Sequence, residues 1–133
     1  MGQPAARMGD TVTGVDVHIV LVPSPGGPVP TPLPHPFVAT IMSGASSDVL
    51  IGGQPAATIG SGTQNSPVHM PMPPGTAFQV PPSNTGTVMQ GSATVLINGK
   101  GVARIGDQVM TCNDPAPLPG GSITTGCVTV MVG

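Results

Sequence analysis

The sequence predicts an all-β fold: a small, conical, pseudo-threefold and β-prism-like domain of three β-hairpins with proline-rich loops between them. Three observations lead to this prediction. One phrase of eight residues occurs three times, a tight-turn signal precedes two of its copies, and no segment has the apolar periodicity of a helix. At 133 residues the chain has the size of one domain, and we expect the repeats to fill it.

The repeated phrase defines the hairpins. It reads QPAARMGD at 3–10, QPAATIGS at 54–61 and KGVARIGD at 100–107. The second copy follows VLIGG at 49–53, and the third follows VLING at 95–99. An apolar, β-branched run that enters a Gly-Gly or Asn-Gly pair is the strongest local signal for a two-residue hairpin turn. Each unit is therefore expected to be strand, tight turn, strand and a closing glycine.

The first copy has no strand-like run before it, but the other end of the chain provides one. Residues 128–133 read VTVMVG and resemble the runs before the other two copies, with Gly133 aligned to Gly52 and Asn98. We therefore expect the last strand to complete the first hairpin. The chain would then form a closed ring of three hairpins.

Composition limits the classes of protein. Glycine and proline are abundant (20 and 18 residues), but only 6% of the residues are charged and 38% are hydrophobic, which is opposite to the signature of a disordered chain. There is no Trp or Tyr and there are two Phe, so the core must consist of smaller side chains. Such a loop-rich chain buries little surface, and we expect an additional stabilising link between its segments.

Charge and hydropathy exclude several partners. Three basic residues and a net charge of −2 do not suit nucleic acid, and no apolar run has membrane-spanning length. The N-terminus lacks the pattern of a secretory signal, so we expect synthesis in the cytoplasm and transport by other components.

Three proline-rich excursions separate the hairpins, at 14–45, 61–86 and 107–121. In the first, we expect short strands at 15–22 and 37–41, joined by a stiff, extended connector with seven prolines at 23–36. All three excursions should leave the hairpins in the same direction and pack into a narrow end. The opposite end should be a broad face with almost no charge.

The few metal-binding side chains follow the repeats. His18 and His69 each lie nine residues after the closing glycine of their repeat, Cys112 lies six residues after its own, and His35 lies in the connector. Three imidazoles and one thiolate make a closed, structural zinc site. The loops would then converge at a metal-stapled tip. The alternative at this point is that these histidines are exposed and bind nothing.

The remaining reactive and charged groups have simpler interpretations. Cys127 lies in a β-run and is expected to be a buried strand residue, with a disulfide to Cys112 as the alternative. Arg7 with Asp10, and Arg104 with Asp107, share a spacing of three residues and are expected to form turn contacts or ion pairs.

The Pro-Ala-Ala-Arg phrase at 4–7 and its threefold recurrence resemble the proline-alanine-alanine-arginine (PAAR) repeat family. The chain departs from the pattern at Thr58, Ser61 and Gly101-Val102. The resemblance implies a cone on the distal end of a trimeric spike of the valine-glycine-repeat (VgrG-like) type. Such spikes belong to contractile injection machines, either type VI secretion systems or extracellular phage-tail-like particles.

The resemblance also implies a site and partners. Family members hold a structural zinc near the point with three His and one Cys, which implies His18, His35, His69 and Cys112 here; iron is the second choice of metal. It implies that the spike binds through a broad apolar base, that effectors or toxins can be attached, and that the target membrane is contacted transiently. We expect no nucleic acid partner, no stable homo-oligomer and no fused effector domain. The protein would be released with the particle.

Two other functions are the alternatives to this one. A small zinc hydrolase would need an open coordination position and a general base, and the chain has no Glu and five Asp. A secreted toxin is the other alternative. We expect no enzymatic activity and assign no catalytic residue.

Overall fold

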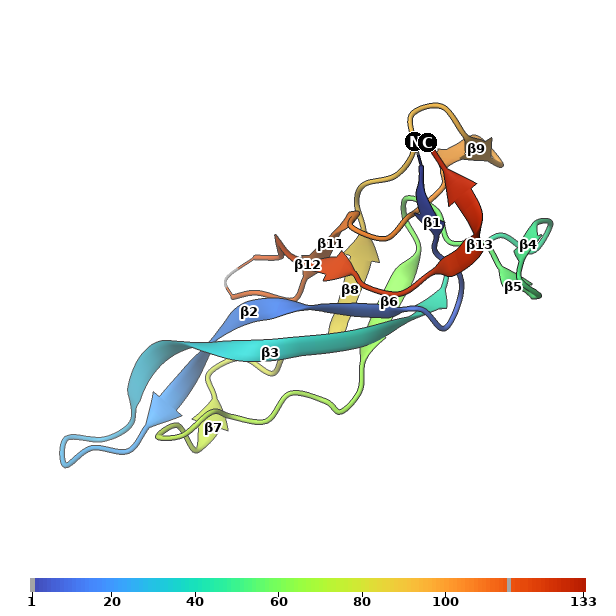
Figure 1. Cartoon of the computed structure of the whole chain (residues 1–133). Helices are drawn as coiled ribbons and strands as arrows, with labels where there is room; N and C mark the ends of the chain where they lie inside the picture. The colour runs from blue at the N-terminus through green and yellow to red at the C-terminus, as the bar shows by residue number, and fades with distance from the viewer. Residues whose placement is uncertain (1, 115) are drawn as a thin grey trace.

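The computed structural model describes residues 2–114 and 116–133, and all regular structure among them is β-strand (Figure 1), as the sequence predicts. None of the described residues belongs to a helix long and apolar enough to cross a membrane. The strands are β1 (Gln3–Ala5), β2 (Thr11–Val22), β3 (Val29–Ser43), β4 (Leu50–Ile51), β5 (Gln54–Pro55), β6 (Gly62–Asn65), β7 (Ala77–Phe78), β8 (Thr85–Val88), β9 (Leu96–Ile97), β10 (Lys100–Gly101), β11 (Gln108–Thr111), β12 (Leu118–Ile123) and β13 (Cys127–Val132).

Three antiparallel hairpins stand at one end of the molecule, as predicted. They are β4–β5, β9–β10 and the pair formed by β1 with β13. In this last pair Gln3 lies opposite Val132, and the two termini lie side by side in Figure 1. The C-terminal strand therefore completes the first hairpin and closes the ring.

The two complete hairpins turn through residues with positive φ. The angles are 58° and 84° at Gly52 and Gly53, and 54° and 80° at Asn98 and Gly99. Two consecutive positive φ values define the type I′ turn, whose twist matches that of the flanking strands. Glycine and asparagine adopt this conformation with the least steric cost, so the turn residues fix the register of each hairpin.

A cycle of backbone hydrogen bonds gives the hairpin end its pseudo-threefold symmetry. The amide of Ala6 donates to the carbonyl of Ala103 (2.8 Å), Ala103 donates to Ala57 (2.9 Å), and Ala57 donates to Ala6 (3.0 Å). All three alanines are completely buried. A methyl group is the side chain that three converging backbones leave room for, so the repeated alanines hold the three units together.

The excursions form a closed barrel rather than loops. Strands β2 and β3 come from the first excursion, β6 and β8 from the second, and β11 and β12 from the third. They pair in the order β2-β3-β6-β8-β11-β12, and β12 pairs again with β2. All these pairs are antiparallel, and β7 adds to the outer part of β2. Closure removes the open sheet edges that six short strands would otherwise expose.

The predicted proline-rich connector is a strand. β3 begins at Val29 and pairs with β2 along the full length of β2, so the first excursion is one long hairpin that projects from the barrel (Figure 1). Prolines occupy every second position from Pro30 to Pro36. Successive residues of a strand point their amides toward opposite edges. In this part of β3 the odd-numbered residues therefore face β2 and form the hydrogen bonds with it. The prolines face the edge without a partner, where no amide is needed.

Small apolar side chains fill the barrel. Equivalent positions form layers, such as Ile41, Val88 and Ile123, whose exposed fractions are at most 1%. Phe37 is the one large aromatic side chain that is completely buried among the described residues. The cluster comprises Ala6, Val12, Phe37, Ala39, Ile41, Ala57, Val88, Ala103, Val109, Cys112 and Ile123. The core is thus limited, as composition predicts.

Charge is distributed differently from our expectation of an almost uncharged hairpin face. The hairpin units contain three basic and three acidic side chains, Arg7, Asp10, Asp48, Lys100, Arg104 and Asp107. Two pairs are neutralised locally, Arg7 with Asp10 and Arg104 with Asp107. Apart from Asp107, which closes the third repeat and is paired with Arg104, the three excursions contain only the charged residues Asp16 and Asp114. The net charge of −2 therefore lies in the barrel half of the molecule.

Candidate metal centre

Four buried metal-binding side chains meet where the three excursions come together. They are Asp16 and His18 on β2, His69 in the segment after β6, and Cys112 directly after β11. One ligand atom from each lies within 4.8 Å of the others. Asp16 and His18 are two residues apart on one strand, so both side chains point to the same face. The structure therefore brings together three of the four predicted site residues and adds Asp16.

The Asp16 carboxylate is central to this cluster. Its Oδ2 lies 3.1 Å from Nε2 of His69, 3.2 Å from Sγ of Cys112 and 3.3 Å from Nε2 of His18. Its Oδ1 has no hydrogen-bond partner among the described residues, and the side chain is fully buried. An isolated buried carboxylate is costly unless a cation or hydrogen bonds compensate its charge.

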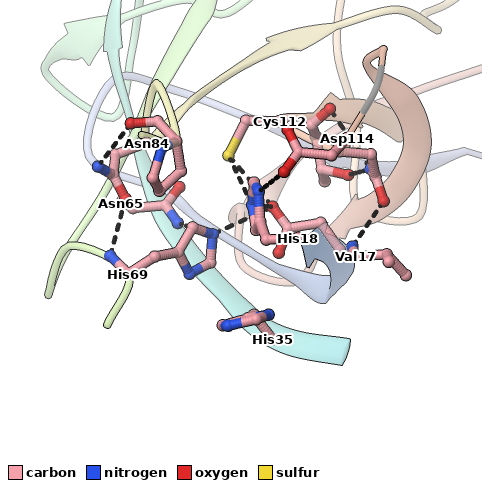
Figure 2. A network of polar contacts seen from close by, with 12 residues as sticks. Val17, His18, His35, Asn65, His69, Asn84, Cys112 and Asp114 are labelled. Carbon is pink, nitrogen blue, oxygen red and sulfur yellow. Dashed lines mark hydrogen bonds and ion pairs between the residues drawn. The ribbon is translucent and has the colours of Figure 1, made fainter. Parts of the chain in front are cut away.

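His18 lies between the carboxylates of Asp16 and Asp114, and Figure 2 shows it beside Cys112 and Asp114. Its Nε2 faces Asp16 and lies 3.7 Å from Sγ of Cys112. Its Nδ1 lies 3.4 Å from Oδ2 of Asp114, an ion-pair distance, and makes no hydrogen bond within the part of the chain that the structure describes. A ligand histidine in proteins usually donates its second ring N–H to a carboxylate or carbonyl, and Asp114 is placed to accept it.

His69 is held by two asparagines. Its backbone amide donates to Oδ1 of Asn84 (2.7 Å), and its Nε2 lies 2.9 Å from Nδ2 of Asn65. Figure 2 shows His69 beside both residues. The side chain is 3% exposed although no strand carries it. These contacts hold His69 in place, with its Nε2 at 3.1 Å from Oδ2 of Asp16.

His35 is close to the cluster but is not part of the four-residue group. Its ring centroid lies 5.4 Å from that of His18 and 5.7 Å from that of His69. Its Nδ1 contacts the carbonyl of Leu33 (2.9 Å), and its Nε2 accepts from the amide of Met72 (3.2 Å). Burial lowers the pKa of His35, which favours the neutral form of the ring. Both ring nitrogens therefore have backbone partners.

The donor set fits a metal ion. Burial, with a further contribution from Asp16, raises the pKa of Cys112 to about 11. A bound cation would instead lower the pKa of Cys112, because metal coordination deprotonates a thiol. Two imidazoles, a thiolate and a carboxylate are suitable ligands for zinc. Among the described residues, Oδ1 of the buried Asp16 carboxylate has no hydrogen-bond partner, and a bound cation would compensate the charge of this group.

The other two sequence predictions concern residues outside the cluster. Both cysteines are free and buried, and Cys127 lies on β13 as expected, so there is no disulfide between them. The carboxylate of Asp107 accepts hydrogen bonds from the backbone amide and the guanidinium of Arg104 (2.8 and 2.9 Å). The Arg7–Asp10 pair has the same form, so these pairs close their repeats.

Comparison with known families supports the repeat interpretation. Residues 79–133 match the family model described as the PAAR motif, a segment that contains the third hairpin, β11, β12 and the ring-closing strand. This segment therefore carries a PAAR motif, which supports the interpretation of the chain as a PAAR-repeat protein. Searches of the curated proteins and of the solved structures return no significant match. The PAAR motif indicates, in general terms, a spike-tip type of function in contractile injection systems and association with a spike complex.

Sequence reasoning missed Asp16. A signal for it was available, because Asp16 and His18 are separated by one residue in a run that was itself predicted to be a strand. Residues at positions i and i+2 of a strand share a face, so a predicted histidine ligand makes its neighbour two residues away a candidate. Asp114 had a weaker signal, since it follows Cys112 in an irregular segment.

Proposed function

We propose that this PAAR protein caps the distal end of a trimeric, VgrG-like spike. The hairpin end would dock on the spike, and the far end of the β2–β3 hairpin would form the point that enters the target membrane. The observation that carries the proposal is the hydrogen-bond cycle of Ala6, Ala57 and Ala103. One chain that repeats its backbone three times about an axis can match a partner made of three identical chains.

Three equivalent side chains support this docking mode. Leu50, Leu96 and Met131 occupy the same position in the three hairpins, and their exposed fractions are 60%, 58% and 56%. Large apolar side chains exposed in a symmetric set are typical of an interaction surface. The charged pairs Arg7–Asp10 and Arg104–Asp107 are compensated within the chain. The contact would therefore be mainly apolar.

The metal would be structural in this proposal. Its ligands come from all three excursions, so a bound ion would join segments that share few large core side chains. Four protein ligands leave no open position for substrate or water. We propose that the ion is zinc and that the protein has no catalytic activity. We also propose that the protein is delivered outside the producing cell as part of the particle. Effectors or toxins would travel with it as cargo.

The stoichiometry of the complex tests the capping role. When the chain is mixed with a trimeric VgrG-like spike, native mass spectrometry should detect one cap for each spike trimer. Replacing Leu50 and Leu96 by Asp should weaken the complex at least about 10-fold, since two buried apolar contacts are lost. Val29→Asp is the matched control, because Val29 is 48% exposed at the opposite end. Three caps for each trimer, or equal effects of both changes, would contradict the proposal.

A further inference from the structure

We infer that Asp16 is a direct ligand of the metal and that His35 is not. The ligand set would then be Asp16, His18, His69 and Cys112. This inference rests on the metal-binding part of the proposed function. It differs from the set of three histidines and one cysteine that the family resemblance implies. Distances, hydrogen bonds and charge in the structure distinguish these two sets of ligands.

Four of the six distances among the ligand atoms fit one ion at their centre, and all six are within 4.8 Å. Ligands of tetrahedral zinc lie roughly 3.3 Å apart for nitrogen and oxygen, and roughly 3.6 Å apart when one of them is sulfur. Oδ2 of Asp16 lies 3.1 Å and 3.3 Å from the two histidine nitrogens and 3.2 Å from the sulfur. The sulfur lies 3.7 Å from Nε2 of His18. Four edges of the tetrahedron are therefore near their bound lengths.

His35 is occupied in a different way. Its Nδ1 must carry the proton in order to donate to the carbonyl of Leu33, which leaves Nε2 to accept from the amide of Met72. Binding a metal through Nε2 would leave that backbone amide without its partner. Nε2 of His69 also has a neighbour, Nδ2 of Asn65, but this is a side-chain group that can rotate away when a metal binds. In Figure 2 His35 stands apart from the connected residues, and no dashed line joins it to them. Through its hydrogen bond with Met72, His35 connects the segment at Met72 to β3.

Charge favours the carboxylate. Asp16 is fully buried, and apart from Asp107, which is paired with Arg104, the charged side chains of the three excursions are Asp16 itself and Asp114. No Lys or Arg of the chain lies in these excursions to compensate Asp16. A divalent ion bound by one carboxylate, one thiolate and two neutral imidazoles makes a neutral group, which is the form that a buried site favours.

Metal affinity of two isosteric variants tests the inference. Asp16→Asn keeps the size and hydrogen-bonding capacity of the side chain but removes its charge, and it should lower the affinity for Zn²⁺ and Co²⁺ at least about 10-fold. His35→Gln can still contact Leu33 and Met72, and its affinity should stay within about threefold of the native protein. Affinities come from competition with a chromophoric chelator. Loss of affinity in His35→Gln, or full affinity in Asp16→Asn, would overturn the inference.

A second measurement requires no substitution. X-ray absorption at the metal edge of the native zinc protein counts imidazole ligands through scattering from the outer ring atoms. Two imidazoles and one sulfur are expected, and three imidazoles would overturn the inference.

The His18→Ala variant distinguishes a wrong ligand assignment from a failure of the proposed metal role. If the native protein binds no zinc, or His18→Ala binds it equally well, the metal role itself fails; if only the imidazole count differs, the assignment of Asp16 fails alone.

Discussion

Asp114 is fixed by backbone contacts before any metal binds. Its carboxylate accepts a hydrogen bond from the amide of Ile19 (3.1 Å), and its own amide donates to the carbonyl of Val17 (2.8 Å). The neighbouring Asn113 accepts from the amide of Val17 (2.7 Å). These contacts tie the segment after β11 to the edge of β2. They place the carboxylate at Nδ1 of His18, where it selects the ring orientation that presents Nε2 to the cluster.

Replacing this carboxylate should weaken the site without removing a ligand. We expect Asp114→Asn to lower zinc affinity about 10-fold, because partners of ligand histidines typically contribute 10- to 100-fold. Asp48→Asn is the matched control, since it removes the same charge from an exposed position in the second hairpin unit. Chelator competition measures both variants. Equal affinities of the two variants would show that Asp114 does not position His18.

At the residue level, spacing predicted more of the site than composition did. The equal offsets of His18 and His69 from their closing glycines were sufficient to place both in one cluster, and Cys112 joined them. The position of His35 and the participation of Asp16 depend on how β2 pairs with β3, where Asp16 lies opposite His35. That register was not predicted, because the prolines of β3 were interpreted as a connector.

Some of the strands could be predicted from the sequence and others could not. The hairpins could be predicted because Gly52-Gly53 and Asn98-Gly99 specify their turns locally. In the barrel, strands were expected at 15–22 and 37–41, within β2 and β3. The other barrel segments could not be predicted, because they are short and polar, as in Gly62–Asn65, or rich in proline, as in the first part of β3. Such segments have weak intrinsic strand preference. Their conformation is imposed by neighbouring strands, which is a tertiary effect.

One turn glycine allows a direct test of the hairpin geometry. Gly99 has a φ of 80°, and a Cβ added to it would meet no atom within 4 Å. Gly99→Ala should therefore cost about 1 kcal/mol of unfolding free energy, purely through backbone strain.

The control is Gly26→Ala, which also meets no atom within 4 Å but has no positive φ. This change should be neutral or stabilising, because it restricts the unfolded chain. Denaturant titration of both variants gives the difference. Equal unfolding free energies would contradict the assignment of the type I′ turn.

For the whole molecule, the metal should compensate for the limited core. Free zinc at about 1,000 times its dissociation constant should raise the unfolding free energy by about 4 kcal/mol. In a chain of this size such a gain corresponds to an increase in Tm of roughly 10 °C or more. Calorimetry with and without a chelator measures the change. The hairpin end lies away from the cluster, so strand content should persist at temperatures below the lowered Tm. An unchanged Tm would show that the metal does not support the fold.

The long β2–β3 hairpin has a consequence for a molecule that is pushed from behind. Its two strands run from the hairpin end to the far end of the body, with all 12 residues of β2 paired (Figure 1). A compressive load along this direction acts parallel to the strands and in shear across the ladder. Shear loads many hydrogen bonds together, whereas peeling breaks them one after another. Because β2 is also bonded to β12 and β3 to β6, the load passes around the closed ring, and no single strand has to carry it.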